Sequence, residues 1–168
     1  MEEIEIVAYD PEWPSVYETE RALVLTALAG IEVVAIAHIG STAVPGLAAK
    51  PVIDIAASVR SLGAARERAR APLEALGYAF WSDNPDPEHL FFVKGLPPSA
   101  AQRTHHLHIV EPGEWFDDSL RFRDILRRDP TAARSYEALK RDLAARHGAD
   151  REAYTEAKST FVAVILSR

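Results

Sequence analysis

Residues 38–55 read HIGSTAVPGLAAKPVIDI and join two apolar segments through a loop that is rich in glycine and proline. The segment 31–39 is rich in Val and Ile and predicts a buried strand. The segment 51–59 predicts a second strand, because a proline is tolerated at the first position of a strand. Gly40-Ser41 therefore follows one strand, and Asp54 lies within the next.

This strand–loop–strand arrangement suits a phosphorylated ligand. Gly40 has no side chain, so a phosphate can approach its backbone, and Ser41 and Thr42 supply hydroxyl and N–H donors. Asp54 on the adjacent strand could hold a metal ion that bridges phosphates. The structural alternatives are that Ser41 caps the following turn and that Asp54 accepts hydrogen bonds from the loop.

Periodicity predicts the other elements of the chain. Two strands with a Gly- and Pro-containing loop between them favour an antiparallel hairpin at 89–94 and 104–111. A short strand is predicted at 78–81. Helices are predicted from Asp10 to near Gly30 and over 62–76, 114–128, 131–146 and 152–166, the last two separated by His147-Gly148. This order predicts a single α+β domain over 1–168, with a mixed β-sheet, helices on one face and a helical C-terminal third.

Composition excludes several classes of protein. The 168 residues suffice for one domain with a full core. The formal net charge of −6 argues against strong binding of a nucleic-acid backbone but not against a nucleotide. The absence of cysteine excludes disulfides, thiolate catalysis and iron–sulfur clusters. Because neither a signal peptide nor a membrane-spanning apolar run is present, we expect a cytoplasmic protein without membrane contact. The oligomeric state stays open.

The stretch 38–55 resembles the signature of the nucleotidyltransferase superfamily that includes DNA polymerase beta: Gly-Ser, about a dozen residues, then Asp, an apolar residue and a second acid. Together with YDPEWP at 9–14, RTHHLHIVEPG at 103–113 and DREAYTEAKSTF at 150–161, it is similar to the GrpB family of that superfamily. The resemblance covers essentially the whole chain. It implies a nucleotidyltransferase-like fold, a nucleotide at Gly40-Ser41 and a metal-binding role for Asp54. GrpB-like domains also occur attached to dephospho-coenzyme A kinase, an association with nucleotide or coenzyme A metabolism.

The chain departs from the superfamily pattern at Ala56, where the second acid is expected. Alternate residues of a strand share a face, so Ala56 falls on the same face as Asp54. Two metal ions ~3.5–4 Å apart need several anionic ligands to offset their repulsion. The ordinary two-magnesium mechanism is therefore not expected, and enzymatic activity stays uncertain.

Strand alternation brings two histidines to the face of Asp54. If Leu107 and Ile109 belong to the core, His106 and His108 lie on the open face of the sheet. One Asp and two His can bind a single transition metal such as zinc, manganese or iron, but they suit magnesium poorly. The alternative is that both histidines are structural, which is the role we expect for His105 on the apolar face.

Other side chains near the loop complete the candidate site. Lys50 and Arg103 either neutralise an anionic ligand or form solvated strand ends, and His38 either borders the pocket or packs within the sheet. Lys94, Glu88 and His89 are weaker candidates. The expected catalytic and metal-binding residues are Asp54, His106 and His108, and the expected ligand-binding residues are His38, Gly40, Ser41, Thr42, Lys50 and Arg103.

These residues support three hypotheses. The first is a nucleotidyltransferase-like enzyme that binds a nucleotide, with Mg, Mn or Zn as the candidate metals, and transfers a nucleotidyl group to a small acceptor. The second is a non-catalytic module that binds a nucleotide or another phosphorylated metabolite, which Ala56 favours. The third is a single-metal hydrolase or metal-binding protein that uses Asp54, His106 and His108.

Overall fold

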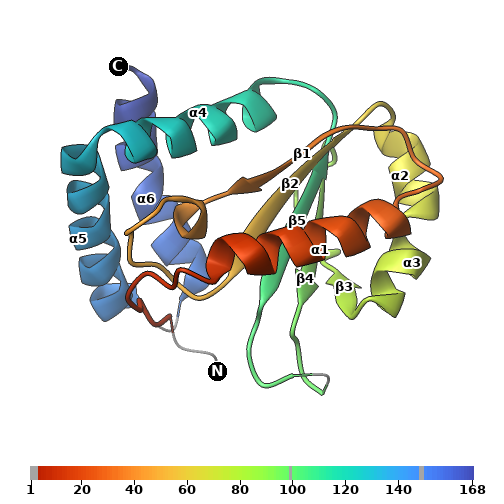
Figure 1. Cartoon of the computed structure of the whole chain (residues 1–168), viewed down its shortest axis with the longest axis horizontal. Helices are drawn as coiled ribbons and strands as arrows, with labels where there is room; N and C mark the ends of the chain where they lie inside the picture. Colours follow the sequence, from red (N-terminus) through yellow and green to blue (C-terminus); the bar gives the residue numbers. More distant parts are fainter. Residues whose placement is uncertain (1–3, 99, 148–149) are drawn as a thin grey trace.

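A five-stranded sheet with the order β1-β2-β5-β4-β3 forms the centre of the computed structural model, which describes residues 4–98, 100–147 and 150–168 (Figure 1). Strands β2 and β5 are parallel, and the other neighbouring pairs are antiparallel. The strands are β1 (Val33–Ile39), β2 (Ile53–Val59), β3 (Tyr78–Phe80), β4 (His89–Lys94) and β5 (His105–Val110). The predicted mixed sheet and hairpin are thus confirmed.

Helices flank this sheet on both sides (Figure 1). They are α1 (Trp13–Ala27), α2 (Leu62–Arg68), α3 (Arg70–Ala75), α4 (Glu114–Arg128), α5 (Pro130–His147) and α6 (Arg151–Leu166), with a 3-10 turn, η1 (Ser41–Ala43), after β1. The predicted α+β class and helical C-terminal third are confirmed. Gly148, one of the predicted helix breakers, lies outside the described residues. Within the described part of the chain, no helix is long and apolar enough to cross a membrane.

Helices α1, α2 and α3 cover one face of the sheet and enclose the main core. Ile53 and Ile55 of β2 and Leu107 and Ile109 of β5 lie in this core and are at most 2% exposed. Burial of each such side chain contributes about 1.5–3 kcal/mol of transfer free energy. The predicted apolar face is therefore the core face. Asp54 lies between Ile53 and Ile55, so its side chain is on the opposite face of the sheet.

The opposite face is covered only in part. Helix α4 packs Phe116 onto Ala56 and Val110 near one end of the sheet. Helices α5 and α6 pack beside α4, as the element contacts and Figure 1 show. The face of β2 and β5 beyond α4 is left open for a site.

Two helix boundaries differ from expectation. The helix predicted over 62–76 is divided at Ala69, because Pro72 lacks an N–H and its ring crowds the carbonyl four residues earlier. The first helix begins at Trp13. Asp10 Oδ1 instead accepts a hydrogen bond from Glu12 N at 2.9 Å, in the turn that precedes the helix.

Candidate functional site

The loop between β1 and β2 begins in a conformation that favours glycine. Gly40 has φ +73° and ψ −173°, a region that L side chains rarely adopt. A Cβ atom at this position would lie 2.8 Å from Asp54 Oδ2. Gly40 therefore allows the carboxylate of Asp54 to lie directly against the loop.

His38 supports this loop from the core side of the sheet. Its Nε2 lies 2.8 Å from Thr42 Oγ1, and its ring stacks on Tyr17 of α1 with centroids 4.7 Å apart. Burial lowers the pKa of His38 to about 4, so the ring is neutral at pH 7. Arg123 of α4 donates to the His38 carbonyl at 2.9 Å. His38, expected to bind ligand, is thus placed behind the loop.

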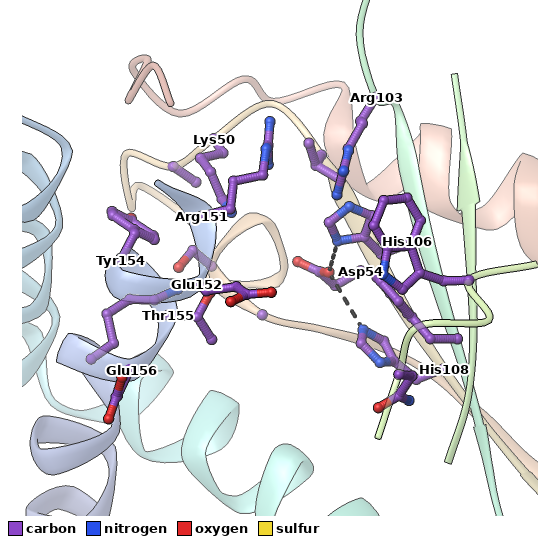
Figure 2. Close-up of a pocket in the computed structure, with 18 of the residues that line it drawn as sticks. Lys50, Asp54, Arg103, His106, His108, Arg151, Glu152, Tyr154, Thr155 and Glu156 are labelled. Carbon is purple, nitrogen blue, oxygen red and sulfur yellow. Dashed lines mark hydrogen bonds and ion pairs between the residues drawn. The ribbon is translucent and has the colours of Figure 1, made fainter. Parts of the chain in front are cut away.

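Two histidine rings approach the same carboxylate oxygen of Asp54. The register of β2 and β5 sets His106 opposite Asp54, and His106 Nδ1 donates to Asp54 Oδ1 at 3.1 Å (Figure 2). His108 Nε2 lies 3.7 Å from the same oxygen. Burial alone would raise the pKa of Asp54, but the hydrogen bonds and charges of the two histidines hold it well below its usual range. Asp54 is therefore ionised at neutral pH.

A third histidine and two aromatic rings fix His108. His89 Nε2 lies 2.8 Å from His108 Nδ1. The ring of His108 stacks on Phe91 with centroids 4.8 Å apart and lies 5.2 Å from the ring of Trp115. Burial lowers the pKa of His89 to about 4. A neutral His89 can donate to His108, whose other nitrogen then faces Asp54.

The three side chains expected to hold a metal ion contact one another directly. The nitrogens of His106 and His108 that face Asp54 share one carboxylate oxygen as hydrogen-bond or ion-pair partners. Among the residues that the structure describes, no three His, Cys, Asp or Glu side chains are arranged to hold a metal ion. Ala56, where the resemblance led us to look for a second acid, is fully buried beneath α4. The two-metal mechanism, which the sequence did not lead us to expect, thus lacks its second carboxylate, and a metal site at Asp54, His106 and His108 stays a prediction.

One large cavity, the central cavity, lies between the open sheet face and helices α5 and α6. Its volume is about 1320 Å³. Of the nine predicted site residues, His38 alone does not line it. The other eight do: Gly40, Ser41, Thr42, Lys50, Asp54, Arg103, His106 and His108. The structure thus brings together side chains from the loop, β2 and β5 that were assigned to the site separately.

The far wall of the central cavity consists of residues that the sequence did not single out. Helix α5 contributes Tyr136 and Lys140, and α6 contributes Tyr154 and Lys158. Figure 2 shows the first turns of α6 facing Asp54 across the cavity. The only signal in the sequence was the family-like segment 150–161, whose pattern does not reveal which strand the helix faces.

Two other candidate residues belong to a buried network on the core side. Lys94 Nζ lies 2.8 Å from Glu20 Oε1, and Tyr78 donates to the same oxygen at 2.9 Å. His105 Nε2 lies 3.8 Å from Glu20 Oε2. The structural role expected for His105 agrees with this placement, and Lys94 does not line the central cavity.

A family model described as GrpB protein matches residues 3–168. The chain belongs to the GrpB family. The crystal structure of GrpB from Enterococcus faecalis is similar with a TM-score of 0.84 and 30% identity, over 97% of this chain and 95% of that one. The α+β architecture is therefore that of a solved GrpB protein.

Two longer proteins contain similar sequences. A UPF0157 protein from Pseudomonas aeruginosa is 48% identical over 98% of this chain and 67% of its own length. A protein from Mycolicibacterium paratuberculosis, named dephospho-CoA kinase, is 31% identical over 92% of this chain but only 43% of its own length. The similarity to the kinase is thus confined to part of that protein.

Proposed function

We propose that this GrpB protein binds a nucleotide or a related phosphorylated small molecule in the central cavity. The observation that carries the proposal is that the Gly40-Ser41 loop and the basic side chains of Lys50 and Arg103 line the same cavity. Backbone N–H groups, hydroxyls and positive charges are the groups that proteins use to hold phosphates. The similarity to part of a dephospho-CoA kinase favours the same class of ligand.

The central cavity is larger than a typical small-molecule site and has room for such a ligand. Small-molecule sites have volumes of about 300–1,000 Å³, and the central cavity has about 1320 Å³. Trp81, which has Arg103 over its ring, and Phe91, which stacks on His108, also line the cavity and make part of its lining aromatic. A nucleotide would fill much of this space and leave room for a small acceptor.

Transfer of a nucleotidyl group to that acceptor is the catalytic form of the proposal. Asp54 Oδ1 is engaged by histidine, whereas Oδ2 lies towards Gly40 at the loop. An ionised carboxylate at this position can accept a hydrogen bond from an acceptor hydroxyl and orient its oxygen towards the α-phosphate on the loop. The new O–P bond forms as the bond to the pyrophosphate leaving group breaks, and the hydroxyl proton passes to solvent. Orientation of two reactants is a large source of rate enhancement.

A non-catalytic binding module is the second candidate, and Ala56 favours it. The second carboxylate of the superfamily is absent, and its position is filled by an apolar cluster under α4. A protein without that acid can retain the phosphate-binding loop and yet not turn its ligand over. Binding without reaction is then the expected behaviour.

Calorimetric titration with ATP, GTP, CTP and dephospho-CoA, each with and without Mg²⁺, tests the binding proposal. We expect saturable one-to-one binding of at least one of these compounds. Ser41→Ala should weaken this binding roughly 2- to 10-fold, which corresponds to the net free energy of one hydrogen bond. Ser119→Ala, at an exposed position of α4, is the matched control. Absence of binding by all four compounds to folded protein would contradict the proposal.

A nucleotide labelled at the α-phosphate, incubated with a pool of small hydroxyl and amine acceptors, separates the two candidates. Label transfer that Asp54→Asn abolishes supports the transferase. Binding without transfer to any acceptor supports the binding module. Transfer that Asp54→Asn leaves unchanged would refute the role assigned to Asp54.

A further inference from the structure

Two lysines from different parts of the chain face one aromatic ring in the central cavity. Lys158 Nζ of α6 lies 4.5 Å from the centroid of the Tyr154 ring, and Lys50 Nζ lies 5.1 Å from the same centroid. Figure 2 shows Lys50 and Tyr154 on the α6 side of the cavity, across from His106. The ring attracts each ammonium group, but the two positive charges repel each other, and a bound anion would offset that repulsion.

A third lysine on this wall is almost completely buried. Lys140 of α5 is 2% exposed, and its Nζ donates to the carbonyl of Ala48 and lies 5.0 Å from the centroid of Tyr136. In the described chain, neither Lys140 nor Lys158 forms an ion pair with a carboxylate. Burial of an ammonium group without a carboxylate is costly, which implies a compensating negative charge from elsewhere.

The hydroxyl group of Tyr154 points to the same conclusion independently. Tyr154 is fully buried, lines the central cavity, and its hydroxyl oxygen has no hydrogen-bond partner among the described residues. Buried polar groups normally have partners. An unsatisfied hydroxyl on the ring that two ammonium groups face indicates a missing ligand with hydrogen-bonding oxygens.

The electrostatics of the three lysines agree with the geometry. Burial, and then the charge of Lys158, lowers the pKa of Lys140 to about 7. Burial, and then the charge of Lys50, lowers the pKa of Lys158 to about 8, against the opposing charge of Asp54. The charges of Lys50 and Lys158 thus disfavour the charged form of Lys140, and the charge of Lys50 disfavours that of Lys158.

We propose that Lys50, Lys140, Lys158 and Tyr154 form a subsite for a phosphate group that carries two or more negative charges. A dianionic phosphate matches several ammonium groups better than a carboxylate with a single charge, and lysine binds phosphate as a point charge. The inference rests on the proposed function and sharpens it: the ligand carries a phosphate monoester or diphosphate at the α5–α6 wall. The source is either the tail of the loop-bound nucleotide or a second phosphorylated molecule.

Titration with inorganic pyrophosphate and with inorganic phosphate tests this subsite without a nucleotide. We expect wild-type protein to bind pyrophosphate, and Lys158→Gln and Lys140→Met each to weaken that binding at least 10-fold. Arg134→Gln, which removes one positive charge from an exposed position of α5, should change it less than 2-fold. Because Lys158 is only half-buried, Lys158→Gln retains the test if Lys140→Met does not fold.

Competition with ATP separates the inference from the proposed function. Displacement of ATP by pyrophosphate supports the subsite and identifies it with the nucleotide tail, whereas simultaneous binding supports it for a second phosphorylated molecule. Pyrophosphate binding by a protein that binds no nucleotide retains the subsite and refutes the proposed function. Failure of folded wild-type protein to bind pyrophosphate, or equal binding by the lysine variants, would overturn the subsite.

Discussion

Asp54 has its two carboxylate oxygens in different surroundings. Oδ1 accepts from His106, and Oδ2 lies where a side chain on Gly40 would need to be. This close approach depends on a backbone without Cβ, which explains why Gly is required at the start of the loop. The site is thus sensitive to a single methyl group.

Gly40→Ala is expected to reduce both stability and ligand binding. The strained backbone costs about 1–3 kcal/mol, and the new Cβ would meet Asp54 Oδ2 at 2.8 Å. Gly46→Ala is the matched control, because Gly46 has φ +80° but a Cβ there meets nothing within 4 Å. Denaturant unfolding should show the larger loss for Gly40→Ala. An equal loss in both variants would mean that the contact with Asp54 is unimportant.

Buried His38 should make stability depend on pH. Its pKa is lowered from 6.5 to about 4 in the folded chain, so between these values the unfolded state binds more protons. The free energy of unfolding should therefore fall as pH falls from 6.5 to 4, by at most about 1.4 kcal/mol per pH unit from this residue.

The variant His38→Gln checks this expectation by denaturant unfolding across pH 4–7. It should flatten part of the slope, and His89, whose pKa is also lowered to about 4, should retain another part. His147→Gln near the end of α5 is the control. A slope that His38→Gln leaves unaltered would contradict the assignment.

At the scale of elements, neighbouring residues on one face of β2 have different surroundings. Asp54 borders the central cavity, whereas Ala56, two residues later, lies with Ile39 and Phe116 under α4. Helix α4 therefore covers β2 beyond Asp54, so that only one position on this face of the strand borders the cavity. A second acid at position 56 would lie in an apolar cluster.

Ala56→Asp is expected to destabilise the protein by roughly 3–5 kcal/mol, because it buries an unpaired charge. Val34→Asp is the control, since Val34 is 48% exposed on the edge strand β1, and should cost less than about 1 kcal/mol. Thermal unfolding measures both. If Ala56→Asp proves as stable as wild type, helix α4 does not seal this position.

Strand alternation could be predicted from the sequence because its period of two is a local property. It placed His106 and His108 on the face of Asp54 before any register was known, and the parallel pairing of β2 with β5 then made them neighbours. Alternation could not decide the role of His38, which lies in β1 just before the loop but points towards α1.

The residues of the α5–α6 wall could not be predicted from local sequence patterns. A helix period identifies an apolar face but not the partner of the remaining faces. Lys140 and Lys158, both more than 80 residues after β2, reach the central cavity only because the C-terminal helices lie across it from that strand. Such long-range placement depends on packing that no short segment specifies.

For the molecule as a whole, the central cavity combines charges of both signs. The chain has a formal net charge of −6, and acidic side chains such as Asp54 line the cavity together with three lysines, Lys50, Lys140 and Lys158. Their ionisation should be coupled to the binding of an anion, because a phosphate favours the protonated forms.

ATP binding at pH 8 is expected to take up protons, on the order of one per site, since the pKa values of Lys140 and Lys158 are about 7 and 8 and would rise beside the anion. Affinity should therefore fall as pH rises from 7 to 9. Calorimetry at pH 8 in two buffers of different ionisation enthalpy measures the uptake. Lys158→Gln should reduce it and Arg134→Gln should not. Identical enthalpies in both buffers would count against this coupling.

A structure determined from crystals soaked with ATP tests most directly the claim that a nucleotide binds in the central cavity. The account predicts phosphate density in the central cavity, within hydrogen-bonding distance of Ser41 and extending towards Lys158. Density for the nucleotide elsewhere, or an empty cavity at saturating ATP, would contradict it.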